Sequence, residues 1–558
     1  MKGKREETMK RTMARMRRFW LPLFAAALIA PVWALAQVRV VDENQAPGRT
    51  MAQQATKERT VWITADHSRH EPLQQTFQSG PEVTKACLSC HELAAGQFHK
   101  TIHWTWLDPS RPPEERIGKA GITLNNFCIN AQSNWPRCTS CHAGYGWKDE
   151  SFNFKDEYAV DCLVCHEQTG TYKKFPTGAG HPVDKPTVFK ANGKLYEPPD
   201  WNKVAQSVAR PTRKNCGTCH FFGGGGDAVK HGDLDSSMMM PNKALDVHMG
   251  TDGQDFDCVR CHTTELHRIA GRIYSNPAAG HRKSLVEDDL AAKIMCESCH
   301  TSTPHKPGVK ANDHTDKVAC QSCHIPAFAR ELATKMWWDW STAGQKKEGK
   351  PFAEKGPHGK PSYDSLKGSF VWEKDVVPEY FWFNGAIQTL TAQDVVDPSR
   401  TVAVNTPLGS PDDPMSRIFP FKVHRGKQPY DKINKTVVIP KLFGPPGSGA
   451  YWADWDWRRS IEIGMQTAGI PFSGEFDFVE TSYVFPITHM VAPKEQSLQC
   501  IECHSKEGRL QNLAGFYMPG RDRNPVVHFL GWAVVLGSLL GVFVHGIGRM
   551  VAGRRKEK

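Results

Sequence analysis

Residues 137–147 read RCTSCHAGYGW and contain the pattern C-x-x-C-H, in which two cysteines are followed at once by a histidine. This pattern occurs eight times and uses sixteen of the 17 cysteines in the 558-residue chain. C-x-x-C-H is the attachment signature of c-type haem, where two thiols form thioethers with the macrocycle and the histidine reaches the iron. In chain order, boxes 1 to 8 are Cys87/Cys90/His91, Cys138/Cys141/His142, Cys162/Cys165/His166, Cys216/Cys219/His220, Cys258/Cys261/His262, Cys296/Cys299/His300, Cys320/Cys323/His324 and Cys500/Cys503/His504.

Two other chemistries use paired cysteines, and the pattern argues against both. Zinc sites are also built from C-x-x-C pairs, but here every such pair has a histidine directly after it. A disulfide framework does not require histidine at that position. The sequence therefore predicts eight covalently bound haem c groups with their iron, and it leaves open whether calcium is bound as well.

The N-terminal 36 residues have the pattern of a secretory signal peptide. A basic region ending at Arg17 and Arg18 precedes the apolar run FWLPLFAAALIAPVWALA (19–36), whose last three residues match an A-x-A cleavage site. We expect residues 1–36 to direct export and residues 37–80 to lead into the haem region. An uncleaved N-terminal anchor is the alternative.

The C-terminal end carries a second apolar stretch. Residues 526–548 have no formal charge and are long enough to span a bilayer. The basic tail 549–558 follows, which by the positive-inside rule places the tail in the cytoplasm. With 511–525 as a linker, we expect the haem-bearing part on the periplasmic side of the bacterial inner membrane, held by a single C-terminal helix.

Residues within this stretch suggest a membrane partner. His528 and His545 lie inside the span, where histidine is a functional hypothesis by default. Gly537 and Gly541 form a G-x-x-x-G pair, which allows close helix packing. We expect a membrane cytochrome b or another quinol-linked electron donor. Ligation of haem b by the two histidines, or an interfacial position without that role, both stay open.

The net charge of +11 does not indicate a nucleic-acid partner. Residues 1–36 carry a net charge of +6 and residues 549–558 a net charge of +4, which leaves the exported part near neutrality. The basic ends are therefore topology signals, and no nucleic acid is expected.

The boxes divide the chain into regions. Residues 81–330 hold seven boxes, 331–495 hold none and are rich in aromatic residues, and 496–510 hold box 8. The aromatic-rich region either shields haem edges or closes a substrate pocket. With 46 Gly and 38 Pro, the chain is predicted to be mainly α with extensive loops. We expect a multihaem cytochrome c fold organised around eight covalent haems, plus one C-terminal transmembrane helix.

The histidines supply the expected iron ligands. Outside box 2, the box histidines are His91, His166, His220, His262, His300, His324 and His504. Haems used for electron transfer usually take a second ligand. The best-placed candidates are His99, His103, His181, His231, His248, His267, His305, His314, His424 and His489.

Several stretches together carry a family resemblance. The eight boxes, NNFCIN (125–130), RCTSCHAGYGW (137–147), DCLVCHEQTGTYKKFP (161–176) and SLQCIECHS (497–505) resemble the octahaem tetrathionate reductase family of multihaem c-type cytochromes. Its wider kin include hydroxylamine oxidoreductases and pentahaem nitrite reductases. The resemblance covers about residues 60–510 and implies seven bis-histidine haems and one catalytic haem, the second in the chain, with a lysine ligand and an open iron face.

The catalytic lysine and histidine are not fixed by the resemblance. In the pentahaem kin the lysine replaces the histidine of the box, but box 2 here ends in His142, so the lysine must come from outside. Lys148 is the first candidate and Lys155 the second. His142 either ligates the iron or swings away to donate to a bound oxyanion.

These features predict an enzyme fed by the quinone pool, a multi-electron reductase of a small nitrogen or sulfur oxyanion such as tetrathionate, nitrite or hydroxylamine. The alternatives are a non-catalytic electron conduit and a hydroxylamine-oxidising enzyme. Cys128, the one cysteine outside the boxes, lies ten residues before box 2. It is either a small buried hydrophobe or a thiol that lines the pocket and exchanges with a sulfur substrate.

Overall fold

The computed structural model describes residues 46–56, 65–109, 111–271 and 294–554. The predicted signal peptide lies outside these residues. Backbone contacts divide the chain into two units, of which the smaller is Met1–Thr60 with Met295–His314 and the larger is Val61–Ile294 with Thr315–Lys558.

The smaller unit is built around box 6. Its described part contains α2 (Pro47–Thr56), α11 (Glu297–His300) and a 3₁₀ turn at Lys310–His314. The Gly48 amide donates to the Pro304 carbonyl at 3.0 Å. A Cβ atom on Gly48 would lie only 2.6 Å from the His300 carbonyl oxygen and from Pro304 Cβ, so α2 can approach box 6 only with glycine at this position.

Short helices carry the boxes of the larger unit. A single helical turn suits C-x-x-C because residues three apart lie on the same face, which aims both thiols at one group. The helices that contain or end at boxes are α3 (Gly80–Leu88), α6 (Leu163–His166), α8 (Arg213–His220), α9 (Cys258–Cys261), α12 (Cys320–His324) and α15 (Cys500–Cys503). Box 2 instead forms a 3₁₀ turn, Cys138–Cys141. The other helices before box 5 are α4 (Ala94–Phe98), α5 (Ile102–Thr105) and α7 (Trp201–Gln206).

The region between boxes 7 and 8 forms a mixed sheet of eight strands in the described part of the chain. The prediction of a mainly α fold is wrong for this region, because its aromatic and β-branched residues pair over long sequence distances, which favours strands. The strands are β5 (Thr334–Asp339), β8 (Ala353–Lys355), β9 (Pro361–Asp364), β10 (Gly368–Glu373), β11 (Glu379–Phe383), β13 (Val402–Ala403), β15 (Arg417–Asp431) and β16 (Phe476–Pro486).

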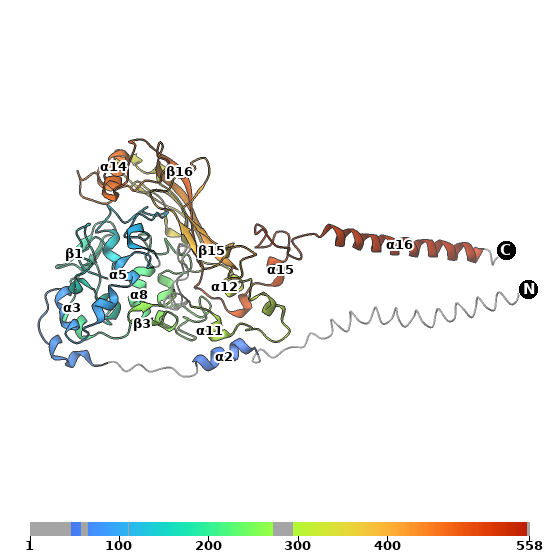
Figure 1. The fold of residues 1–558 in the computed structure, drawn as a ribbon, viewed down its shortest axis with the longest axis horizontal. Coiled ribbons are helices and arrows are strands. Elements are labelled where there is room, and N and C mark those ends of the chain that lie inside the picture. The colour runs from blue at the N-terminus through green and yellow to red at the C-terminus, as the bar shows by residue number, and fades with distance from the viewer. Residues whose placement is uncertain (1–45, 57–64, 110, 272–293, 555–558) are drawn as a thin grey trace, which may run out of the picture. The chain divides into compact units, whose positions relative to one another are not determined.

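Strand β15 is the centre of this sheet. It pairs antiparallel with β16 over eleven residues, from Phe421 opposite Pro486 to Asp431 opposite Phe476, and the two strands run side by side in Figure 1. Its other edge pairs with β11 in the first part and with β5, in parallel, at residues 425–427. The remaining order runs from β5 through β10 and β9 to β8.

One face of β15 is hydrophobic and the other carries buried polar side chains. Alternate residues of a strand point to opposite faces. Phe419, Phe421 and Val423 pack in one hydrophobic cluster with Val484 of β16. The even-numbered positions carry Lys422, His424 and Gln428, which are buried and polar. The sequence segment before box 2 meets this second face, as described below.

The main hydrophobic core joins the sheet to that segment. Ile122, Leu124, Phe127 and Ile129 pack in one cluster with sheet residues such as Trp338, and Cys128 lies against it. The indole nitrogen of Trp340 donates to the Phe127 carbonyl at 2.9 Å. The aromatic-rich region is therefore continuous with the surroundings of box 2.

Smaller elements also occur in the described residues. Four two-stranded pairs are β1 (Thr187–Phe189) with β2 (Lys194–Tyr196), β3 (Thr264–Glu265) with β4 (Arg268–Ile269), β6 (Lys346–Lys347) with β7 (Lys350–Pro351), and β12 (Ile387–Thr389) with β14 (Asn405–Pro407). Helices α13 (Tyr451–Asp454) and α14 (Trp457–Ala468) lie between β15 and β16 in sequence.

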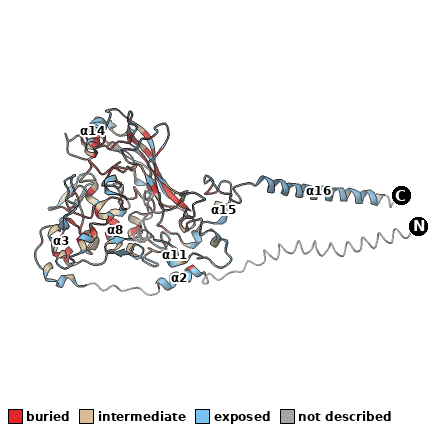
Figure 2. Cartoon of the chain, in the orientation of Figure 1, coloured by how far each residue is buried: buried red, intermediate tan, exposed pale blue. Residues whose placement is uncertain are grey.

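The last helix, α16 (Pro525–Arg554), contains the predicted membrane span. Within Pro525–Gly553, the most apolar window of 18 residues has a mean hydropathy of 2.1. None of its most apolar window is buried, and Figure 2 shows the helix exposed along its length. By length and composition it could cross a membrane.

Candidate functional site

Most box histidines with a resolved partner are held in the same way. The Nδ1 atom of each faces a backbone carbonyl, which fixes the ring and directs Nε2 to the other side, as is usual for metal-binding histidines. For His166, His262, His300 and His504 the carbonyl partners are those of Ala209, Ala270, Gly48 and Pro519, at 2.9, 2.9, 3.2 and 3.0 Å. Two thiols beside an imidazole oriented in this way are a donor set that fits covalently attached haem.

The two predicted attachment cysteines of a box differ in burial, which the uniform C-x-x-C-H pattern does not reveal. Cys90 of box 1 and Cys299 of box 6 are exposed, whereas the first cysteines of these boxes, Cys87 and Cys296, are half-buried. In box 1 the reason is that Cys87 belongs to α3 and faces box 3, while Cys90 follows the end of the helix. In box 6, Cys299 lies within the single turn of α11, whose His300 end is the part that meets α2. The other exposed box cysteines are Cys141, Cys261 and Cys500.

Burial also shifts the pKa of a box thiol. Burial raises the pKa of a thiol because it disfavours the charged thiolate. It raises the pKa of Cys165, which is half-buried, to about 11. At neutral pH the Cys165 thiol is therefore protonated.

Three of the box histidines have a second imidazole ring about 6 Å away. Since a ring nitrogen lies about 2 Å from a bound metal, two imidazoles on one ion have ring centres about 6 Å apart. The observed centre-to-centre distances are 6.4 Å for His67 and His91, 6.1 Å for His103 and His220, and 6.3 Å for His262 and His489. Boxes 1, 4 and 5 therefore each have a second histidine at the spacing of a shared iron.

The first of these pairs was missed by the sequence reasoning. His103 and His489 are among the predicted second ligands, but His67 is not. It lies in the lead-in ahead of box 1, and its distance along the chain from any box gives no local signal. The only cue is the density of histidine in DHSRH, residues 66–70.

The second imidazole of box 5 has a carboxylate partner. The Asp233 carboxylate accepts from His489 Nδ1 at 3.2 Å and from the backbone amides of Thr488 and His489 at 2.8 and 2.9 Å. Burial acts to raise the pKa of Asp233, but the hydrogen bond and the charge of His489 hold it at about 2. The carboxylate in turn raises the pKa of His489 against the effect of burial. A carboxylate–histidine pair of this kind makes the ring a stronger donor to a metal.

His267 occupies a strained turn. It is the second of two consecutive residues with positive φ, 48° for Leu266 and 64° for His267, at the tip of the β3–β4 hairpin. Such turns favour glycine and asparagine, so a leucine and a histidine there cost energy. The Nδ1 atom of His267 pairs with Gln97 Oε1 at 3.1 Å, and the charge of His166 acts on its ring. This placement brings His267 to the neighbourhood of box 3.

The other predicted second ligands are dispersed. His424 is completely buried, lies 4.6 Å from the Phe127 ring, and has no hydrogen bond to either ring nitrogen within the described residues. His99 stacks on Trp104 at 4.5 Å. His181 lies 5.3 Å from Tyr145, His231 5.4 Å from Phe485 and His248 6.3 Å from Phe256. In the smaller unit, His305 Nδ1 pairs with Asn312 at 3.2 Å and His314 ends the 3₁₀ turn.

The thiols bring boxes together in an order different from that of the chain. Cys87 and Cys162 of boxes 1 and 3 lie within hydrogen-bond reach, as do Cys141 and Cys219 of boxes 2 and 4. Cys216 and Cys258 link boxes 4 and 5 in the same way. Boxes 7 and 8 are joined by the Leu498 amide, which donates to the Cys323 carbonyl at 3.0 Å. Box 4 therefore adjoins both box 2 and box 5.

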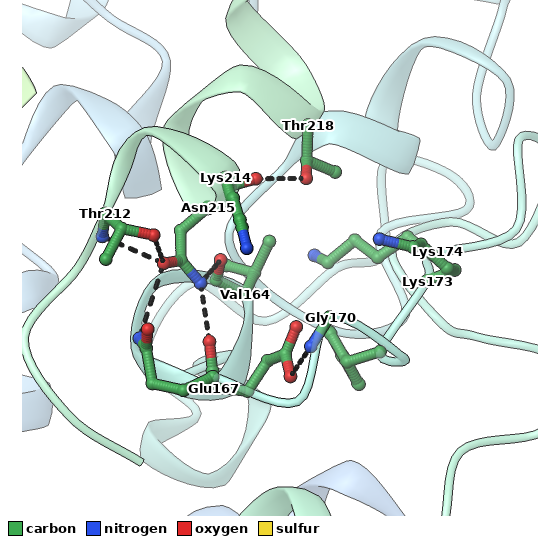
Figure 3. A pocket seen from close by; sticks show the side chains of 11 residues that line it. Val164, Glu167, Gly170, Lys173, Lys174, Thr212, Lys214, Asn215 and Thr218 are labelled. Atoms are coloured by element: carbon green, nitrogen blue, oxygen red, sulfur yellow. Dashed lines mark hydrogen bonds between the residues drawn. The ribbon is translucent and has the colours of Figure 1, made fainter. Parts of the chain in front are cut away.

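A small polar pocket lies between boxes 3 and 4, and Figure 3 shows Lys173 and Lys174 reaching into it. On its other side, the Asn215 side chain donates to the Glu167 carbonyl at 2.9 Å and accepts from the Thr212 amide at 2.9 Å. Asn215 thus fixes α8 against the end of box 3.

Box 2 departs from the common arrangement. His142 is completely buried, and its Nε2 atom, not Nδ1, donates to a backbone carbonyl, that of Trp104, at 2.7 Å. Its Nδ1 atom has no hydrogen-bond partner among the described residues. Burial lowers the pKa of His142 to about 3, so the ring is neutral. The rings of Trp104, Trp106, Trp147, Phe152 and Phe154 surround it at 4.9 to 6.3 Å.

The lysines near box 2 differ in burial. The side chains of Lys148 and Lys155, the two sequence candidates, are exposed. Lys174 is buried and forms an ion pair with Asp161 at 2.9 Å. An ammonium held by a carboxylate has no electron pair to give to a metal.

Lys230 was not predicted from the sequence. It is half-buried, and burial, together with the charge of the adjacent Lys119 amine, lowers its pKa well below the ordinary value. Lys119 in turn acts electrostatically on the thiols of Cys138 and Cys141 and lies 5.7 Å from the Trp106 ring. Lys230 therefore lies in the neighbourhood of box 2, with its amine shifted towards the neutral form. It lies 88 residues after His142, beyond the range of any local pattern.

Cys128 lies close to the same box. It is half-buried against the main core, and burial raises the pKa of its thiol. Burial also raises the pKa of Cys138 to about 12, and the nearby Cys128 thiol adds to that rise. The two sulfur atoms are therefore within electrostatic reach, and Cys128 is a protonated thiol at neutral pH.

The sequence and the fold match known cytochromes. Residues 335–507 match the family model described as bacterial cytochrome c, and residues 86–167 match that of cytochrome c554 and c-prime. The crystal structure of octahaem cytochrome c from Shewanella oneidensis is 46% identical, covers 80% of this chain and 95% of its own, and superposes with a TM-score of 0.69. An uncharacterised protein of Archaeoglobus fulgidus is 23% identical over 226 residues, which cover 34% of this chain and 75% of that protein.

Proposed function

Because this chain belongs to the octahaem c-type cytochromes, we propose that it is a multihaem reductase of a small nitrogen or sulfur oxyanion, such as tetrathionate or nitrite, or of hydroxylamine, with box 2 as the catalytic site. When bound, haem supplies a redox iron with a ligand position at box 2 and electron carriers at the other boxes. The observation that carries the proposal is the turned imidazole of His142, whose Nε2 donates to Trp104 while the other resolved boxes use Nδ1.

Lys230 is the lysine ligand of box 2 in this proposal, in place of Lys148 and Lys155. A lysine amine is a good donor only when it is deprotonated, and burial shifts Lys230 in that direction. The side chains of Lys148 and Lys155 are exposed to solvent instead. Lys119 and Arg137 add positive charge near Cys138, which attracts an anionic substrate.

The histidine pairs serve electron transfer. His67 with His91, His103 with His220, and His489 with His262 are the two-histidine ligand sets of boxes 1, 4 and 5, and their ring spacings support this. The thiol contacts of box 4 with boxes 2 and 5 give electrons a short route to the catalytic box.

Electron paramagnetic resonance tests the catalytic role of box 2. The wild-type protein should contain eight haems, of which one lacks a two-histidine signature and changes its signal when nitrite or tetrathionate is added. Replacing Lys230 by Ala should alter that signal and abolish turnover with haem content retained. Lys148→Ala and Lys155→Ala are the matched controls, and they should keep the wild-type signal and the wild-type turnover.

Other outcomes favour the alternatives. Eight two-histidine signals that do not respond to either ligand would leave an electron conduit. If the protein oxidises hydroxylamine faster than it reduces nitrite or tetrathionate, it is a hydroxylamine-oxidising enzyme and not a reductase. Loss of activity in Lys148→Ala alone would return the lysine assignment to the sequence candidate.

Electrons enter at box 8 from the membrane. Export by the signal peptide places the boxes in the periplasm, and α16 anchors the chain beside a quinol-linked donor such as a cytochrome b, with Gly537 and Gly541 as a packing surface. The His504 Nδ1 atom pairs with the Pro519 carbonyl at 3.0 Å. Six residue steps separate Pro519 from the start of α16, a reach of at most about 20 Å.

Deleting residues 525–558 tests this arrangement. The truncated protein should be released from membranes, keep its haems and its turnover with a soluble reductant, and lose turnover with quinol. Retained quinol-driven turnover would contradict the membrane donor without affecting the assignment of box 2.

A further inference from the structure

A buried lysine of the sheet holds the chain segment that carries Lys230. Lys422 lies on β15 and is completely buried. Its Nζ atom donates to the carbonyls of Val229 and Lys230 at 3.1 and 3.0 Å and to Thr334 Oγ1 at 2.6 Å. Burial lowers the pKa of Lys422 to about 7. Its three partners nevertheless all accept, since the Thr334 hydroxyl gives its own proton to Ala228, and they match the three protons of an ammonium. A buried charge is costly unless it is paired or bonded in this way, so the position of Lys422 fixes the position of its acceptors.

Thr334 holds the next carbonyl of the same segment. It lies on β5, which pairs with β15, and it is completely buried. Its hydroxyl accepts from Lys422 and donates to the Ala228 carbonyl at 2.7 Å. Two side chains of the sheet therefore hold three consecutive carbonyls, at residues 228–230, within a segment that consists of turns and bends.

The side chain of Lys230 also rests on the sheet. Its Nζ atom lies 5.5 Å from the ring of Phe485, on β16. A lysine side chain is long and flexible, so the place that its amine can reach depends on how firmly its backbone is held. The sheet supplies both a fixed backbone and a surface for the stem.

We propose that Lys422, through Thr334 and the carbonyls of residues 228–230, is the positioning residue for the Lys230 amine at box 2. This rests on the proposed role of Lys230 and assigns a function to the haem-free region, whose strands hold the catalytic segment. Misplacement of a reacting group by about 1 Å can cost on the order of 100-fold in rate, so a clamp of this kind matters for catalysis.

The test uses full-length, haem-loaded protein. Lys422→Met keeps the length and the apolar stem of the side chain but removes all three donors. The matched control is Lys335→Met, because Lys335 is also a buried lysine of the sheet, 4% exposed, but its Nζ atom lies 3.7 Å from the rings of Trp338 and Phe370 and not on residues 228–230. A second pair is Thr334→Val, which loses the hydroxyl, against Thr334→Ser, which keeps it.

The readouts are the paramagnetic resonance signal of the box 2 haem, the affinity for nitrite by optical titration, and haem content. Lys422→Met and Thr334→Val should shift the box 2 signal and weaken nitrite binding at least tenfold, with the two-histidine signals unchanged. Lys335→Met and Thr334→Ser should resemble the wild type. A purely structural role for Lys422 would instead lower haem content or thermal stability without a specific change at box 2.

Some results would overturn the proposal. They are a wild-type box 2 signal and nitrite affinity in Lys422→Met, or the same change in Lys335→Met as in Lys422→Met. If Lys422→Met does not accumulate, Thr334→Val and Thr334→Ser are compared instead. The same box 2 signal and nitrite affinity in these two variants would contradict the positioning role. If Lys230→Ala alters the box 2 signal but Lys422→Met does not, only the positioning role fails. An unaltered signal in Lys230→Ala refutes the lysine assignment itself.

Discussion

The Nε2 atom of His142 donates a hydrogen bond to the carbonyl oxygen of Trp104 at 2.7 Å. In a haem-attachment box this nitrogen is the one that usually reaches the iron, and here a backbone carbonyl occupies it. The aromatic rings around His142 leave it buried and neutral. Box 2 therefore keeps the histidine that the attachment pattern requires, but its ring is turned the other way from those of His166, His262, His300 and His504.

The buried state of His142 predicts a pH dependence of stability. Its pKa is about 3 in the folded protein and about 6.5 in an unfolded chain. Between these values the unfolded chain binds a proton that the folded protein does not, so the free energy of unfolding falls as the pH decreases. Urea unfolding from pH 7 to pH 4 should show a steeper loss in the wild type than in His142→Phe. Equal slopes would mean that His142 is not buried and neutral in the haem-loaded protein.

The carboxylate of Asp233 should lower the reduction potential of the box 5 haem. Its bond to His489 Nδ1 strengthens the donation of that ring to iron, which stabilises the oxidised state. Asp233→Asn should therefore shift one midpoint in a spectroelectrochemical titration to a more positive potential. Asp235→Asn is the control, because Asp235 is equally buried on the same segment but accepts from the Ser237 amide. If no midpoint potential shifts in Asp233→Asn, His489 is not a ligand of the box 5 iron.

Gly48 should be intolerant of a side chain. A Cβ atom there would meet the His300 carbonyl and Pro304 at 2.6 Å, and overpacking of this kind costs roughly 1–3 kcal/mol. Gly48→Ala should increase hydrogen–deuterium exchange in residues 295–305 and lower the occupancy of box 6. Gly96→Ala in α4 is the control, since nothing in the described residues lies within 4 Å of its added Cβ. Unchanged exchange in Gly48→Ala would contradict the contact between α2 and box 6.

Cys128 tests the sulfur branch of the proposed function. Its protonated thiol lies near Cys138. If it exchanges with a sulfur substrate, Cys128→Ser should reduce tetrathionate turnover at least tenfold and leave nitrite turnover within twofold of the wild type. Equal rates with tetrathionate in both proteins would assign Cys128 to core packing alone.

The sequence predicted the parts of this protein that are encoded locally. The eight boxes predict haem attachment because each is a run of five residues, and the family resemblance that they carry is confirmed by the 46% identity to an octahaem cytochrome c. The apolar stretch 526–548 likewise predicts α16, whose bounds extend only a few residues further.

The features that were missed depend on distant contacts. The eight-stranded sheet arises from pairings such as Val423 with Val484, 61 residues apart, and strand pairing of this range leaves only weak local patterns. Lys230 and His67 reach their places through the same long-range packing. Box 2 likewise contacts box 4 through Cys141 and Cys219, 78 residues apart, which no local pattern reveals.

The alternation along β15 makes the site sensitive to strand register. Lys422 holds residues 229 and 230, and Gln428, on the same face, donates to the Asn125 carbonyl ahead of box 2. A slip of one residue against β16 would turn both side chains to the opposite face and release both segments at once. The eleven-residue ladder of β15 with β16 thus sets the separation of the two chain segments at box 2, and a single-residue deletion within it would disturb both segments from more than 180 residues away.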